Sequence, residues 1–178
     1  MADLLLPKAG DDCLSVRQPW ATGLVTPSKA NPTVPVKPVE NRTKRWPSTR
    51  QLPVDVWIHA SLTVDYSDAA GQAVAWLGEE RYGRQPYAVE VLALHHRLKK
   101  TVGVIVGRVT FTGCHHAEGE CHACQGIGTC DRSAHCSPRW AEPDVWHWQA
   151  ANPMPLATPI PAKGRLGLWK WTEAARRG

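Results

Sequence analysis

The chain has 178 residues, of which 43% are hydrophobic and 21% are charged. This length suits one ordinary domain with a single core, and the balance excludes an intrinsically disordered chain. No apolar run reaches the roughly 20 residues of a transmembrane helix, and the N-terminal segment lacks a basic leader and a cleavage site. We therefore expect a cytoplasmic protein with no membrane partner, whose six cysteines are free thiols or metal ligands rather than disulfides.

Basic residues are concentrated in one segment. The formal net charge is +5, from 21 basic and 16 acidic residues. The segment 29–50 holds one acidic residue, Glu40, and six basic residues, which are Lys29, Lys37, Arg42, Lys44, Arg45 and Arg50. Such a local field attracts phosphate groups and is screened by salt, although a solvated basic loop without a partner is the alternative interpretation.

The first part of the chain predicts short strands and one short helix. A strand at 12–16 ends at Gln18-Pro19, and Pro19 suits the first position of a helix that runs through Val25. Four prolines between 27 and 38 indicate an irregular loop. The segments 39–44 and 54–60 are predicted as strands.

The second part begins with two predicted helices, at 63–80 and 87–97. The segment 101–112 is the clearest strand, and its glycines Gly103 and Gly107 suggest a bend or a close backbone approach.

A Cys/His-rich insertion at about 114–139 follows. The last predicted strands, 145–149 and 165–171, are separated by a proline-rich run. The pattern predicts a single α+β domain over 1–178, built on a curled sheet or barrel.

Five motifs follow one another in a fixed order along nearly the whole chain. They are Leu-Ser-Val-Arg-Gln-Pro-Trp-Ala at 14–21, Lys-Pro-Val-Glu-Asn-Arg at 37–42, Trp-Ile-His-Ala-Ser at 57–61, Gly-Val-Ile-Val-Gly-Arg-Val at 103–109 and Pro-Ile-Pro-Ala-Lys-Gly-Arg-Leu-Gly-Leu-Trp at 159–169. Together they resemble the ASCH domain, a family of the PUA-like superfamily. The resemblance implies a small PUA-like β-barrel flanked by helices, with a cleft that accepts RNA or a nucleobase. Relatives include nucleic-acid-binding modules, acetylcytidine amidohydrolases and ribonucleases. The fold therefore restricts the class of partner more than it restricts the type of reaction.

A nucleobase cleft needs a flat wall for stacking, fixed donors and acceptors for the base edge, and cations for the phosphates. Gln18 could present its amide to a base, and Trp20 could stack on it or belong to the core. Glu40 and Arg42 share one face of a strand, whereas Lys37 points the other way unless the intervening proline redirects it. The residues predicted to bind a nucleic acid or base are Ser15, Arg17, Gln18, Pro19, Trp20, Asn41, Arg42, Lys44, Arg45, His59 and Ser61.

Lys37 and Glu40 are the catalytic candidates if the protein is a hydrolase. In amidohydrolase relatives, a lysine at this place is paired with a hydroxyl residue three positions later, whereas position 40 here is Glu. A partly desolvated Lys37 with a lowered pKa would then work with Glu40 in proton transfer. An ordinary surface ion pair is the alternative. His59 and Ser61 are expected at a cleft wall, with a structural role for the histidine as the alternative.

The insertion predicts a structural zinc site. Cys121 and Cys124 form a Cys-x-x-Cys-x-Gly-x-Gly motif that resembles the zinc modules of J-proteins, and Cys130 and Cys136 complete four thiolates. The insertion has almost no large apolar side chains, so a metal would replace a core; a flexible loop with free thiols is the alternative. Possible substitute ligands are Cys114, His116, His122 and His135.

Three functions remain open from the sequence. The first is a module that binds single-stranded RNA or an exposed, possibly modified, nucleobase in a basic cleft. The second is a hydrolase of modified cytidine or RNA, and the third is a protein-interaction adaptor that uses the zinc loop. The sequence leaves open the choice between RNA and DNA, the base recognised and the oligomeric state.

Overall fold

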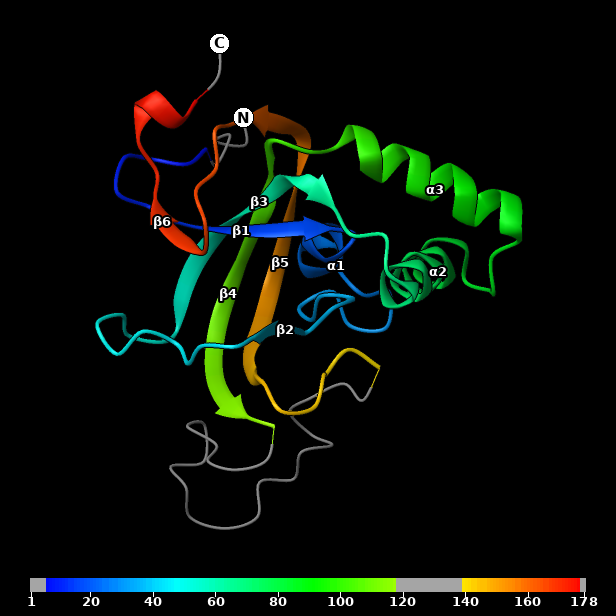
Figure 1. Ribbon diagram of the computed structural model, residues 1–178, viewed down its shortest axis with the longest axis horizontal. Helices are drawn as coiled ribbons and strands as arrows, with labels where there is room; N and C mark the ends of the chain where they lie inside the picture. Colours follow the sequence, from blue (N-terminus) through cyan, green and yellow to red (C-terminus); the bar gives the residue numbers. More distant parts are fainter. Residues whose placement is uncertain (1–5, 118–138, 177–178) are drawn as a thin grey trace.

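The computed structural model describes residues 6–117 and 139–176, and in these the fold is α+β with one mixed sheet and three α-helices (Figure 1). In chain order the elements are β1 (Asp12–Gln18), α1 (Trp20–Val25), β2 (Val39–Arg42), β3 (Val54–Val64), α2 (Asp68–Tyr82), α3 (Ala88–Lys100), β4 (Val104–His116), β5 (Trp146–Pro161), β6 (Leu168–Lys170) and the 3-10 helix η1 (Glu173–Ala175).

The sheet has six strands in the order β2-β5-β4-β3-β1-β6. β1 and β3 are parallel, and the other neighbouring pairs are antiparallel. The sheet curls so far that Arg42 of β2 donates a hydrogen bond of 3.2 Å to the carbonyl oxygen of Ser15 on β1. The described strands nevertheless form an open sheet, because the short strands β2 and β6 stay at its two edges. The predicted α+β class and curled sheet are confirmed, whereas the predicted barrel is not closed by these strands.

The two faces of the sheet carry separate hydrophobic cores. Side chains alternate along a strand, so Leu14 of β1 packs on the face that α1 covers, whereas Cys13 packs on the other face with Trp169 of β6. In β3, Ile58 and Trp57 divide in the same way. We call these the α1 face and the β6 face. Cys13 is fully buried and packs there as a small hydrophobic residue.

The start of α2 differs from the prediction of a helix over 63–80. Thr63 and Val64 continue β3, and the helix begins at Asp68. Ser67 caps it, since its side chain accepts a hydrogen bond from the backbone N–H of Ala70. β-branched residues favour a strand and serine favours the N-cap, which explains the later start. The predicted helix at 87–97 is confirmed as α3, and it ends at Lys100.

β4 and β5 are both longer than predicted. β5 runs from Trp146 through the proline-rich segment to Pro161, where the sequence predicted a break. Beyond the short strand β2, β5 pairs on one side only, so prolines without an N–H group are tolerated there. β4 extends to His116 and so includes the first three residues of the predicted insertion.

The remaining strands differ from prediction mainly at their ends. β2 ends at Arg42 rather than at residue 44, and β6 spans 168–170 rather than 165–171. The predicted close approach at Gly107 is confirmed, since a Cβ there would lie 2.5 Å from the carbonyl oxygen of Met154. The bend at Gly103 is confirmed by its φ of +66°. None of the helices in the described ranges has the length and apolar character to cross a bilayer.

Candidate functional site

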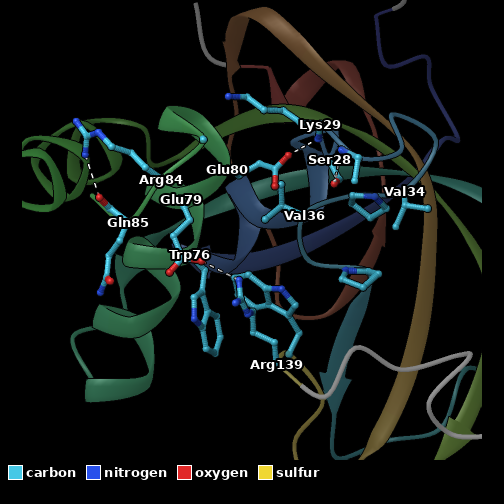
Figure 2. Close-up of a pocket in the computed structure, with 15 residues that line it drawn as sticks. Ser28, Lys29, Val34, Val36, Trp76, Glu79, Glu80, Arg84, Gln85 and Arg139 are labelled. Atoms are coloured by element: carbon cyan, nitrogen blue, oxygen red, sulfur yellow. Dashed lines mark hydrogen bonds and ion pairs between the residues drawn. The ribbon is translucent and has the colours of Figure 1, made fainter. Parts of the chain in front are cut away.

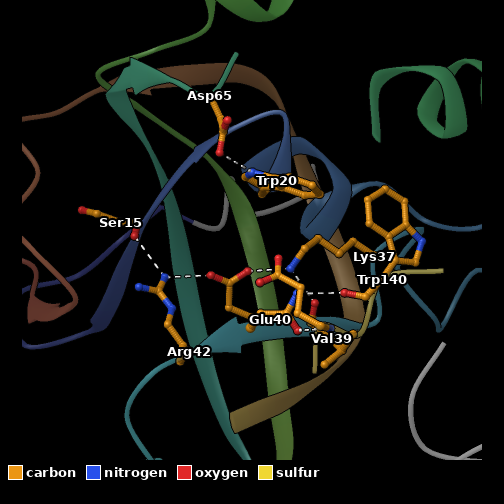
Figure 3. Close-up of polar contacts among 10 residues, drawn as sticks. Ser15, Trp20, Lys37, Val39, Glu40, Arg42, Asp65 and Trp140 are labelled. Atoms are coloured by element: carbon orange, nitrogen blue, oxygen red, sulfur yellow. Dashed lines mark hydrogen bonds and ion pairs between the residues drawn. The ribbon is translucent and has the colours of Figure 1, made fainter. Parts of the chain in front are cut away.

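Lys37, Glu40 and Arg42 form a continuous chain of ion pairs on the α1 face (Figure 3). The Lys37 Nζ atom lies 2.7 Å from Glu40 Oε2, and Arg42 Nη2 lies 2.9 Å from Glu40 Oε1. The Lys37 and Glu40 side chains are only 3% and 7% exposed, whereas Arg42 is 24% exposed. The array is therefore an internal one that reaches solvent at its Arg42 end.

The loop before β2 and helix α1 bring Lys37 to this position. Its backbone N–H donates to the carbonyl oxygen of Gly23, and a Cβ on Gly23 would lie 3.0 Å from the Lys37 Cβ. Its ammonium also donates to the carbonyl oxygen of Val39, at 2.5 Å. Strict alternation would have sent Lys37 to the opposite face from Glu40, so the bend at Pro38 redirects it toward the carboxylate.

The electrostatics of the array follow from its burial. Burial lowers the pKa of Lys37 below its ordinary value, and the Glu40 carboxylate opposes this shift only in part. Burial alone would raise the pKa of Glu40, but Lys37 and Arg42 outweigh it and hold that pKa below its ordinary value. Glu40 is thus ionised between two cationic groups. Arg42 retains an unused donor, because its buried Nε has no acceptor within residues 6–117 and 139–176.

Two tryptophans border the array. Trp20 is half-buried, and the Lys37 Nζ atom lies 5.9 Å from the centre of its ring. Trp140 is buried and meets Trp20 edge-to-face, with ring centroids 6.1 Å apart. Asn41 holds Trp140 in place by donating to its carbonyl oxygen at 2.8 Å. Asn41, predicted to bind a base, therefore positions the ring that borders the site.

Asp65 adds an acceptor on the side of Trp20 away from Val39 (Figure 3). Its carboxylate accepts from the indole N–H of Trp20 at 3.3 Å and from the backbone N–H of Ser67 at 2.9 Å. The Ser67 N–H is the main cause that lowers the pKa of Asp65. Sequence reasoning missed both Asp65 and Trp140. The Asp-x-Ser spacing before α2 was a signal for Asp65, whereas no local pattern pointed to Trp140.

Gln18 and Pro19 are structural residues, and the prediction that they contact a base is corrected. Gln18 is fully buried; its amide donates to the Thr101 carbonyl oxygen and accepts from the backbone and hydroxyl of Thr22. Pro19 is likewise fully buried beside it. The amide of Gln18 ties β1 to α1 and to the end of α3, and it does not reach the surface.

The other predicted cations are exposed. Arg17 lies on β1, where its charge helps to keep the Asp65 carboxylate ionised by lowering its pKa. Lys44 and Arg45 follow β2, and the guanidinium of Arg45 lies 5.7 Å from the centre of the Trp146 ring. Exposed cations next to the partly exposed Arg42 extend the positive charge of the array along the surface.

Ser15, His59 and Ser61 do not join the Lys37 array. They line a separate cavity of about 350 Å³. Ser15 alternates with Leu14 along β1, and His59 alternates with Ile58 along β3, so both side chains point to the β6 face. The single cleft predicted from the sequence is therefore two sites on opposite faces of the sheet, connected through Ser15, whose backbone oxygen binds Arg42.

A larger cavity, about 770 Å³, lies between the loop that precedes β2 and helix α2 (Figure 2). The rings of Trp76 and Trp140 meet there at 4.7 Å, and Arg139 lies over Trp76 while it pairs with Glu79 at 2.9 Å. None of the residues predicted to bind a nucleic acid lines it. It borders the Lys37 array through Trp140 and through Val36 and Pro38, the two neighbours of Lys37 in the chain.

The four predicted zinc ligands, Cys121, Cys124, Cys130 and Cys136, lie outside the described residues, as do His122 and His135. Within the described ranges, no group of three or more metal-binding side chains gathers. Cys114 is buried in the core of the α1 face, where its sulfur accepts from the backbone N–H of Trp46. Cys114 is therefore a core residue of β4.

Comparison with known proteins adds no family assignment. The chain matches no protein-family model and no curated protein. The resemblance to the ASCH domain thus rests on the five sequence motifs, and function has to be argued from the geometry of the site.

Proposed function

We propose that this protein binds single-stranded RNA or an exposed nucleobase at the Lys37–Glu40–Arg42 array. The observation that carries the proposal is the convergence of these three side chains beside Trp20, with Arg42 still partly exposed and its Nε without an acceptor among the described residues. With Lys37 ionised, two cations face one carboxylate, so the array has a net charge of +1. It therefore favours an electron-rich or anionic group.

The side chains around the array match the needs of a base edge. Arg42 supplies donors at the exposed end of the array, the carboxylate of Asp65 supplies an acceptor, and Trp20 supplies a flat ring, while the buried Lys37 adds positive charge from behind. RNA-binding proteins read unstacked bases with such combinations of ring stacking and hydrogen bonds.

The phosphates of the same strand would lie along the exposed cations. Lys44 and Arg45 follow Arg42 directly in the chain. Phosphate contacts make affinity fall as the salt concentration rises, with a slope of about 0.7 per contact for single strands. The double variant Lys44→Ala/Arg45→Ala is expected to reduce that slope and to weaken binding to all sequences alike.

Binding of a short, fluorescent single-stranded RNA, followed by anisotropy, tests the base site. Arg42→Gln is expected to weaken binding about tenfold, because a charge-assisted hydrogen bond is lost. Arg42→Lys keeps the charge but loses Nε, so an intermediate affinity is expected. Arg97→Gln, on the exposed surface of α3, is the matched control and should bind like the wild type.

Two results would overturn this proposal. One is the absence of salt-dependent RNA binding by the folded wild type, and the other is equal affinity of Arg42→Gln and Arg97→Gln. Thermal unfolding of each variant, measured in parallel, separates a lost contact from a lost fold.

Hydrolysis of a modified cytidine is a second candidate function, supported by the burial of Lys37. Burial lowers the pKa of this ammonium, and the carboxylate of Glu40 lies 2.7 Å away, as a proton-transfer pair requires. Incubation with acetylcytidine, followed by chromatography, should then show deacetylation that Lys37→Ala abolishes. Undiminished turnover by Lys37→Ala would remove this candidate.

A structural zinc ion in the insertion completes the proposal. The presence of zinc is argued from the spacing of the four cysteines. Its role would be structural, since four thiolate ligands leave no open position for catalysis. Its role would be to order a segment that lacks a core of its own.

A further inference from the structure

The cavity on the β6 face has a polar floor and a basic rim. Its volume is about 350 Å³, and Ser15 and His59 lie at its base, with His59 only 3% exposed. The segment from Ala162 to Leu166 passes over them and forms one wall. This cavity is separate from the Lys37 array, because the sheet lies between the two.

The hydrogen bonds of Ser15 fix a proton on the histidine. The Ser15 hydroxyl donates to the carbonyl oxygen of Arg165 at 2.5 Å, and it accepts from the indole N–H of Trp169 at 3.1 Å. His59 Nδ1 lies 3.2 Å from the same hydroxyl oxygen. Since the only hydrogen of the hydroxyl is used, its oxygen accepts in the contact with Nδ1, while Nε2 of the same ring lies 3.4 Å from the carbonyl oxygen of Ala162. Ser15 is thus fully engaged as a support for the ring and is not a nucleophile.

Gly164 allows the loop to lie directly on the imidazole. A Cβ at this position would come within 2.2 Å of His59 Cε1 and 2.3 Å of Nδ1. Any larger residue would have to displace either the buried ring or the loop. The close packing places the two residues next to Gly164 at the cavity mouth.

Those two residues are the cations Lys163 and Arg165. Both line the cavity and both are exposed. Neither pairs with a carboxylate in the part of the chain that the structure describes, and none of the residues that line the cavity is acidic. Two exposed cations at the mouth of a cavity without acidic lining are a combination suited to the oxygens of a phosphate group.

The rim also has an apolar part. Leu62 is 64% exposed and Leu166 is fully exposed, and both line the same cavity. A ligand with a phosphate group and a non-polar neighbouring group would cover both kinds of surface.

We infer that the cavity formed by Ser15, His59, Lys163, Gly164 and Arg165 is a second binding site, which takes the phosphate group of a phosphate ester. The ester can be a small molecule or the backbone of a nucleic acid strand, since both present the same oxygens. This site does not depend on base recognition at the Lys37 array, so each can exist without the other.

Isothermal titration of the full chain with inorganic phosphate, and anisotropy with a short RNA that carries internal phosphodiesters only, test the site. Lys163→Ala/Arg165→Ala is expected to weaken phosphate binding at least about tenfold. Arg97→Ala/Lys100→Ala, which removes the same two charges from the exposed surface of α3, should leave it unchanged. The His59 ring resonances in a ¹H–¹³C spectrum should shift with phosphate in the wild type and not in the cavity variant.

The two arms distinguish the sources of the phosphate. If the cavity variant loses phosphate and RNA affinity together, the ligand is a nucleic acid backbone; if only phosphate affinity falls, the ligand is a small ester. Failure of inorganic phosphate to bind saturably, or equal affinities of the cavity and control variants for it, would overturn the inference. Loss of RNA binding in Arg42→Gln with phosphate binding intact separates this site from the base site.

Discussion

At the residue scale, Glu40 is the one member of the buried array that contacts both of its cations. Its two carboxylate oxygens divide between them, Oε2 to Lys37 and Oε1 to Arg42. Removing its charge leaves two cations close together, one of them buried. Removing Lys37 leaves an ion pair between Glu40 and the more exposed Arg42. The three residues therefore contribute unequally to stability, although they form one chain of contacts.

This asymmetry gives a prediction for two nearly isosteric variants. Glu40→Gln should lower the free energy of unfolding by about 3 kcal/mol, because an uncompensated charge stays buried. Lys37→Met should lower it by about 1 kcal/mol, since it also removes the cost of burying an ammonium. Urea unfolding at constant m-value measures both. Equal losses, or a larger loss for Lys37→Met, would contradict the asymmetry.

The contribution of Glu40 should depend on pH. Its pKa is lower in the folded protein than the ordinary value of 4.5. The unfolded chain then binds more protons in acid, so the stabilisation is complete above pH 4.5 and is lost as the pH falls through the folded pKa. The stability difference between wild type and Glu40→Gln is therefore expected to shrink in acid. Unfolding free energies measured from pH 7 down to pH 3 test this; a constant difference would be contrary to it.

The sequence predicted the members of this array better than its surroundings. The spacing of Lys37, Glu40 and Arg42 belongs to one short segment, so their proximity follows from local chain geometry. Trp140 and Asp65 come from distant parts of the chain and arrive only through the packing of α2 and the curl of the sheet. The sequence pattern also predicted that the Gln18 amide contacts a base, whereas this amide is fully buried, because a motif shows which residues are present and not which way they point.

At the scale of elements, β4 and β5 form the longest ladder of the sheet, and Gly107 leaves no room for a side chain between them. A Cβ there would lie 2.5 Å from the Met154 carbonyl oxygen and 3.0 Å from the Val25 Cβ of α1. The glycine thus sets the distance between β4, β5 and α1 together. A side chain at this point would have to push the backbone of β4 away from the backbone of β5. A change of rotamer in a neighbouring side chain would not remove this clash.

Gly107→Ala should accordingly destabilise the protein by about 1–3 kcal/mol, the usual cost of overpacking. Gly71→Ala is the matched control: Gly71 lies in α2, and a Cβ there would meet nothing within 4 Å. Because alanine favours a helix, the control should gain about 0.5–1 kcal/mol. Thermal unfolding of the two variants should shift in opposite directions. A neutral Gly107→Ala would mean that β4 and β5 can separate freely.

The type of most elements could be predicted, whereas their ends depended on tertiary contacts. Prolines in 153–161 predicted a break, yet β5 continues there because β4 pairs with it from one side only. The helical pattern from residue 63 predicted α2, but Thr63 and Val64 belong to β3, which pairs with β1 in the sheet. Local patterns carry no information about which strand edge is free, so such boundaries lie beyond sequence reasoning.

At the scale of the whole molecule, Trp140 connects the proposed base site to the insertion along the chain, since it directly follows residue 139. The insertion departs from the paired ends of β4 and β5, His116 and Trp146, which face each other in the ladder. Trp140 follows the insertion in the chain and packs on Trp20 and Trp76, beside the Lys37 array. Order in the insertion should therefore affect the site more than the sheet.

The proposed zinc site offers a test of this expectation. Purified wild type should hold about one zinc ion per chain, and Cys121→Ser/Cys124→Ser should lose it. The variant is expected to bind RNA several-fold more weakly, about 1 kcal/mol, because Trp140 loses its anchored neighbour. Its cooperative unfolding should stay close to that of the wild type.

Metal analysis, anisotropy and urea unfolding provide the three readouts, and His96→Ala on the exposed surface of α3 is a control that should keep its zinc. Less than about half an equivalent of zinc in the wild type would count against the site. Global unfolding of the variant would show instead that the insertion supports the whole sheet.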